Sequence, residues 1–94
     1  MRVLGEHPAW VSTPVHIETA KQFTHDRLHA QKGDRQIRVQ WRVLSPDEAL
    51  PEIERIASHQ AKLGNLADVA AYEFILDRCA AGEGLVVLAE AVER

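Results

Sequence analysis

The sequence has one cysteine, few aromatic side chains and no long apolar run. The single cysteine, Cys79, excludes a disulfide within the chain, which is typical of a protein in a reducing compartment. No stretch approaches the roughly 18 apolar residues of a membrane-spanning helix, and the first residues lack the apolar segment of a signal peptide. These absences favour a cytoplasmic protein with no membrane partner.

Aromatic residues are also scarce, with two Trp, two Phe and one Tyr among 94 residues, so aliphatic side chains must fill most of the core. Apolar residues still make up 46% of the chain, which favours a folded protein over a disordered one. A chain of this length fits a single domain, to which we assign residues 1–94. The net charge of −3 argues against a general nucleic-acid binder, which usually carries a basic surface.

Strict alternation of apolar and polar residues predicts a β-strand over residues 35–44. One face of this strand would carry Ile37, Val39, Trp41 and Val43, and the other Gln36, Arg38, Gln40 and Arg42. A period of two is typical of a strand that is buried on one face only. We interpret this stretch as the central strand of the sheet.

The first predicted helix covers residues 20–31, with Ala20, Phe23 and Leu28 facing the core. Thr19 is a suitable N-cap for it, because Gln22 follows three residues later. In that interpretation residues 15–18 form a short strand. A rival interpretation begins the helix at Thr13, with Pro14 as its first residue.

The second helix has the clearest start signal in the chain. Ser45 can cap it, Pro46 suits its first position, and Glu48 can complete a capping box with Ser45. Pro51 follows within two turns and removes a helical hydrogen bond. We therefore expect a single turn over residues 46–50 and a kink or restart at Pro51.

The last third of the chain is rich in apolar residues. A third helix over residues 66–81 is apolar on more than one side, including Phe74, so it is either the most buried helix or one shared with another subunit. Residues 85–92 favour a strand over a helix, because two glycines precede a run of β-branched residues. Left unpaired, the edge of that strand would invite pairing with another chain.

These elements predict an α+β fold. We expect a small mixed sheet of three to four strands around the central strand 35–44, with about three helices packed mainly on one face. Residues 1–14 contain two prolines and form an irregular N-terminal arm, in which Trp10 packs on the core or on a neighbour. The short apolar pairs at residues 3–4 and 10–11 suit either brief edge strands or an arm that lies over the core.

No catalytic or cofactor motif is present, so we expect a non-enzymatic protein that needs no cofactor. The best candidate site is the polar face of the strand over residues 35–44, and two apolar residues elsewhere in the chain are further candidates. The partner-binding candidates are Arg35, Arg38, Gln40, Arg42, Trp10 and Phe74. We expect a small protein–protein interaction module, such as an adaptor, inhibitor or structural subunit, that also forms a homodimer or larger assembly.

Two other functions compete with this one. The face of Arg35, Arg38 and Arg42 would suit phosphates, but no aromatic residue shares it for base stacking. His25 and His29 are spaced to share a helix face and would suit a metal ion. No third ligand is evident nearby, and Glu18, His16 or His7 would serve only if the N-terminal arm folded back. Cys79 is interpreted as a buried core residue.

Overall fold

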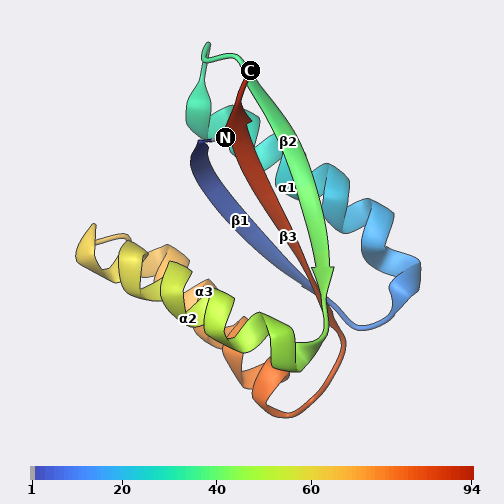
Figure 1. The fold of residues 1–94 in the computed structure, drawn as a ribbon. Coiled ribbons are helices and arrows are strands. Elements are labelled where there is room, and N and C mark those ends of the chain that lie inside the picture. The colour runs from blue at the N-terminus through green and yellow to red at the C-terminus, as the bar shows by residue number, and fades with distance from the viewer. Residues whose placement is uncertain (1) are drawn as a thin grey trace.

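The computed structural model describes residues 2–94, which form three strands and three α-helices (Figure 1). In chain order these elements are β1 (Val3–Val11), the short 3₁₀ helix η1 (Pro14–His16), α1 (Ile17–Lys32), β2 (Ile37–Leu44), α2 (Pro46–Lys62), α3 (Leu66–Ala80) and β3 (Leu85–Glu93). The predicted α+β class is confirmed, and so is the strand expected over residues 85–92.

The sheet has the order β1-β3-β2, and β3 runs antiparallel to both neighbours. The prediction of a mixed sheet with strand 35–44 at its centre is therefore wrong. β3 takes the centre because its apolar run from Val86 to Ala89 is fully buried, which suits a strand covered on both faces. The half-polar β2 lies at an edge instead. Because β3 is paired on both sides, it offers no free edge to another chain.

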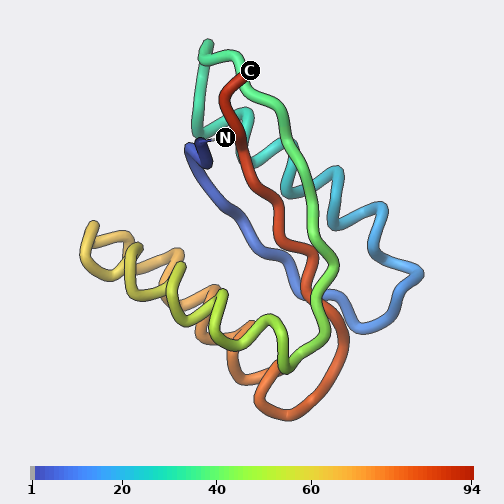
Figure 2. The backbone as a smooth tube through the Cα atoms, viewed as in Figure 1, coloured from blue at the N-terminus to red at the C-terminus, as the bar shows by residue number. Residues whose placement is uncertain are grey.

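Helices cover both faces of the sheet, so the prediction that they pack mainly on one face is also wrong (Figure 1). On one face, Leu28 of α1 packs with Ile37 of β2 and Ala89 of β3. On the other face, Ile53 of α2 and Ile75 of α3 pack with Val86 and Leu88. Figure 2 shows α2 and α3 running side by side as an antiparallel pair on that second face. The apolar residues of β3 contribute to the cores on both faces.

The N-terminal arm predicted as irregular is mostly a strand. β1 pairs with β3 from Val3 opposite Val92 to Val11 opposite Leu85, with an irregularity between Val3 and Gly5. Pro8 did not prevent this, because a strand at the edge of a sheet tolerates a residue without an amide hydrogen. The sheet pairing orders the segment, which has no strong strand pattern of its own.

The first helix begins as the rival interpretation expected. Pro14 starts η1 and α1 follows from Ile17, so residues 15–18 form no strand and Thr19 is no N-cap. Ala20 and Leu28 are buried as predicted. The prediction for Phe23 is wrong, because its side chain is 52% exposed.

The predicted start of α2 is confirmed. The Glu48 amide donates to Ser45 Oγ at 3.3 Å, and the Ser45 amide donates to Glu48 Oε1 at 3.1 Å. The predicted break at Pro51 is wrong, since α2 continues through it to Lys62. Pro51 is exposed, so water can reach the carbonyl that it leaves without a helical donor. The buried Ile53 and Ile56 anchor the next turn to the core.

Candidate functional site

A groove of about 650 Å³ follows β1 between α1 and α3. It exists because β1 is an edge strand while α1 and α3 lie on opposite faces of the sheet, so neither helix closes the space beside the edge. We call it the β1 groove. Its lining comprises His7, Pro8, Ala9, Trp10 and Val11 of β1, His16, Thr19, Ala20, Phe23 and Arg27 of η1 and α1, and Asp68, Ala71, Tyr72, Phe74 and Ile75 of α3.

Several aromatic rings meet one another in the β1 groove. The His7 ring lies 5.8 Å from Phe23 of α1 and 6.4 Å from Tyr72 of α3, between ring centroids. At the other end, Trp10 meets Phe74 edge to face with centroids 6.1 Å apart. Phe23 and Phe74 remain 52% and 49% exposed. Phe23 and Phe74 therefore leave apolar ring surface open to water on opposite walls of the groove.

Arg78 contacts both aromatic rings at the Trp10 end of the groove. Its guanidinium lies 5.7 Å from the Trp10 ring and 5.1 Å from the Phe74 ring, both within cation–π range. Its side chain also contacts the Glu83 carboxylate at 3.2 Å. Trp10 Nε1 donates to the backbone oxygen of Glu83 at 3.0 Å, which ties β1 to the turn before β3.

His7 supplies a buried polar group to the groove. Its side chain is 7% exposed, and within residues 2–94 its Nδ1 has no hydrogen-bond partner. Burial lowers the pKa of His7 below 6.5, Arg27 lowers it further, and Asp68 opposes them. The ring is therefore neutral at pH 7. A neutral imidazole beside apolar rings suits an apolar binding surface better than a charged one.

Tyr72 of α3 is a second buried residue that brings a polar group to the β1 groove. Burial, aided by the negative charge of Asp68, raises the pKa of Tyr72 to about 12. The phenol is therefore neutral as well. In the described part of the chain, neither His7 nor Tyr72 hydrogen-bonds to a side chain that would activate it for proton transfer.

Two charges of opposite sign flank the groove. Arg27 belongs to the α1 wall and Asp68 to the α3 wall. Both act on His7, yet among residues 2–94 neither forms an ion pair. In the described part of the chain, the groove surface thus carries one cation and one anion without an ion partner.

The predicted arginine face of β2 is largely occupied by the chain's own carboxylates. Arg35 pairs with Glu93 at 3.6 Å, and Arg42 pairs with Glu90 at 3.2 Å. Arg38 is exposed and, within the described residues, makes no ion pair. Gln40 lies on the same face, opposite Glu90 of β3. The six predicted site residues therefore separate into two groups. Trp10 and Phe74 lie in the β1 groove, whereas Arg38, Gln40 and Arg42 lie on β2 at the opposite edge of the sheet and Arg35 just precedes that strand.

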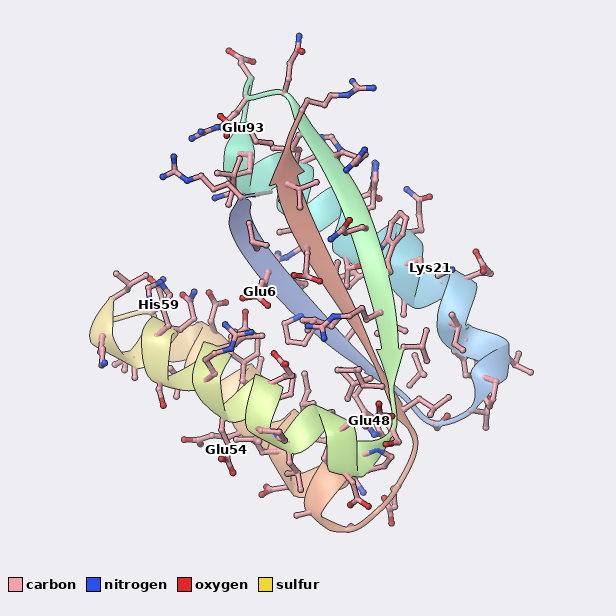
Figure 3. The ribbon with its side chains drawn as sticks, in the orientation of Figure 1. Glu6, Lys21, Glu48, Glu54, His59 and Glu93 are labelled. Carbon is pink, nitrogen blue, oxygen red and sulfur yellow. The ribbon has the colours of Figure 1, made fainter. Side chains whose placement is uncertain are left out.

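An extended ion-pair network links that face to α2. Arg55 contacts both Glu6 oxygens at 2.8 and 2.9 Å and Glu52 at 2.7 Å, and Glu52 lies 3.7 Å from Arg42. Figure 3 shows Glu6 between β1 and α2. The network joins four separate elements of the fold, so no local motif in the sequence signals it. It neutralises much of the positive charge that a phosphate would need.

The two histidines of the metal hypothesis do lie together. The His25 and His29 rings are 4.3 Å apart between centroids, and His25 also stacks on Trp41 at 6.4 Å. Residues 2–94 nevertheless contain no group of three His, Cys, Asp or Glu side chains placed to hold a metal ion. A pair alone leaves half of a tetrahedral site without protein ligands.

Cys79 is buried, as predicted, and burial raises the pKa of its thiol. A protonated, buried thiol is a poor nucleophile. Sequence reasoning did not single out Arg27 or Asp68 and considered His7 only as a metal ligand, because residues far apart in the chain meet only at the β1 edge.

Comparison with known proteins adds no relative, because the chain matches no protein-family model, no curated protein and no solved structure. None of the helices described within residues 2–94 combines the length and the apolar character needed to cross a membrane.

Proposed function

We propose that this chain is a small non-enzymatic protein–protein interaction module and that the β1 groove is its binding site. The observation that carries the proposal is the pair of half-exposed rings, Phe23 at 52% and Phe74 at 49%, on opposite walls of one groove. Burying such a ring against a partner removes a large apolar area from water. Aromatic side chains are also enriched among the residues that dominate binding energy at interfaces.

The character of the groove favours a protein over a small polar ligand. His7 and Tyr72 are neutral within it, and the free charges Arg27 and Asp68 belong to opposite walls. An apolar centre with charges around it resembles the usual anatomy of a protein interface. A small polar substrate would instead need several polar groups converging on one point.

We do not extend the proposal to nucleic acid. Arg35 and Arg42 are paired with Glu93 and Glu90, and Glu6 and Glu52 add negative charge to the same network. A phosphate backbone would have to displace these carboxylates, so binding driven by counterion release would be weak.

The test is a pull-down with the full chain as bait, compared with two variants. Phe23→Asp places a charge in the groove, and Val43→Asp places the same charge at a 44% exposed apolar residue on β2. We expect at least one protein to bind the native chain and Val43→Asp but not Phe23→Asp. Untagged copies of the chain are included in the mixture, so that self-binding is scored too.

The retained protein is then purified and titrated calorimetrically against the three chains. The proposal stands if Phe23→Asp weakens binding by about 30-fold or more, as for an interface residue worth about 2 kcal/mol. It is abandoned if all three baits retain the same proteins with the same affinity. Circular dichroism of each variant checks that the charge has not unfolded the chain.

A further inference from the structure

Helix α3 has an outer apolar face in addition to the face that joins the core. Tyr72, Ile75 and Cys79 are buried against the sheet. The exposed outer stripe consists of Ala67, Ala70, Ala71 and Phe74. Their spacing of three, one and three residues places them along one side of a helix.

This outer stripe points away from α2. Leu76 lines a small hollow together with Ala57 of α2, and it follows Ala67 by nine residues. At 3.6 residues per turn, nine residues amount to two and a half turns, so Leu76 and Ala67 lie on opposite sides of α3. Ala71 and Phe74 also line the β1 groove. The outer stripe therefore extends the surface of the β1 groove along α3. Within residues 2–94, no other helix or strand covers that side of α3.

We propose that a second copy of this chain packs on this stripe, with the two α3 helices antiparallel about a twofold axis between Ala70 and Ala71. The inference rests on the proposed function, because it names the partner of the same groove. The symmetry places Ala70 against Ala71 of the second copy and Phe74 against its Ala67. A large ring then meets a small side chain twice, which is the complementarity that close helix packing requires.

The charges of the surface also suit a second copy. A twofold contact uses one patch on both subunits, so the patch must contain both members of each complementary pair. Here it contains a large ring with small alanines and a cation with an anion. Arg27 and Asp68 lack ion partners within residues 2–94, and we assign Arg27 of each copy to Asp68 of the other. A patch with unpaired charge of one sign only would instead have favoured a different protein of opposite charge as the partner.

An added β-strand is a poorer occupant of this surface. β1 is an edge strand, but Pro8 lies in its middle and is buried. A proline offers no amide hydrogen to a pairing strand, and natural sheets use it to prevent such pairing. Helix packing through side chains does not depend on that donor.

Light scattering with size-exclusion chromatography tests the dimer across protein concentrations from about 1 to about 500 μM, the range for micromolar affinity. We expect the native mass to rise from 10.5 kDa towards twice that value. Ala70→Arg places two like charges at the twofold axis, and Phe74→Glu removes both ring contacts. Each should weaken dimerisation about 30-fold or more, given interface residues of hot-spot strength. Val43→Glu, at a residue 44% exposed on β2, should leave the dimer unchanged.

Ala70→Arg keeps the test valid if Phe74→Glu fails to fold, because Ala70 is exposed and arginine is a good helix former. A native chain that stays monomeric throughout the range overturns the inference. A dimer that survives Ala70→Arg in a folded chain overturns it as well.

A mixing experiment tests the charge pairing. Alone, Arg27→Glu sets two carboxylates against each other at each contact, and Asp68→Arg sets two guanidinium groups together. Both homodimers should therefore weaken. In a heterodimer of the two variants, every contact again joins opposite charges, so mixing should restore a mass near the dimer value. No restoration would overturn the assigned pairing.

The outcome also separates this inference from the proposed function. A monomer that binds a different protein through Phe23 overturns the inference and leaves the function standing. A chain that binds neither its own copy nor another protein through the groove overturns both.

Discussion

Trp10 of β1 and Phe74 of α3 meet edge to face, with ring centroids 6.1 Å apart, although 64 residues separate them in the sequence. This contact joins the edge of the sheet to the helix pair. It also sets the spacing between two walls of the β1 groove. The backbone around Trp10 should therefore be intolerant of change, and Gly84 tests that expectation directly.

Gly84→Ala should destabilise the protein severely. Gly84 has φ +72°, and a Cβ atom there would lie 2.6 Å from Trp10 Nε1 and collide with the Val11 carbonyl oxygen. Strain of the left-handed backbone and overpacking together predict a loss of about 2–4 kcal/mol in the free energy of unfolding. Urea denaturation followed by Trp fluorescence measures it.

Gly82→Ala is the matched control, since Gly82 has φ +74° and no atom within 4 Å of the added Cβ. It should lose only the backbone part, about 1 kcal/mol. Equal losses in the two variants would show that Trp10 does not confine Gly84.

Replacing Arg55 should weaken the link between α2 and the sheet. Glu6 lies directly opposite Glu90 on the neighbouring strand, and their side chains are only 16% and 13% exposed. Arg55 holds Glu6 through two hydrogen bonds, so removing it leaves two like charges facing each other. A double-mutant cycle of Arg55→Met and Glu6→Gln should give a coupling of about 1 kcal/mol that shrinks in high salt. A coupling near zero in low salt would contradict the role given to this pair.

The stability of the fold should fall as the solution becomes acidic, partly because of His7. Burial lowers the pKa of His7 in the folded chain, so the unfolded chain binds its proton more readily. The contribution of His7 is complete above the unfolded pKa of about 6.5 and is lost as the pH falls from there through the folded pKa. Unfolding free energies at several pH values should show a smaller drop below pH 6.5 for His7→Phe than for the native chain. Parallel curves for the two proteins would refute a buried neutral His7.

Ser45→Ala should cost about 1 kcal/mol, the usual value of an N-cap. Ser45 Oγ accepts the Glu48 amide at 3.3 Å, and its loss leaves that donor at the start of α2 without a partner. Thr13 precedes η1 and makes no cap hydrogen bond through its side chain. Thr13→Ala is therefore the control and should change the thermal midpoint little. Similar shifts for both substitutions would argue against the capping box.

Features that depend on neighbouring residues were predictable from the sequence alone. The alternation in β2, the capping box of Ser45 and Glu48, and the glycines around residues 82–84 act over a few residues, so local patterns identify them. The apolar width of α3 predicted either the most buried helix or one shared with another subunit, and the first alternative is wrong, because only Tyr72, Ile75 and Cys79 of α3 are buried. The 49% exposure of Phe74 shows that the extra apolar face points outward.

Only the tertiary structure decided which strand is central and where the groove lies. β1 has weak strand character and contains Pro8, but pairing along β3 orders it. Once β1 takes one edge, β2 takes the other, and helices cover both faces. Arg27, Asp68 and Phe23 then meet β1 at a single groove. These contacts join residues far apart in the sequence, and their free energy depends on the whole packed core. A local sequence pattern therefore cannot predict them.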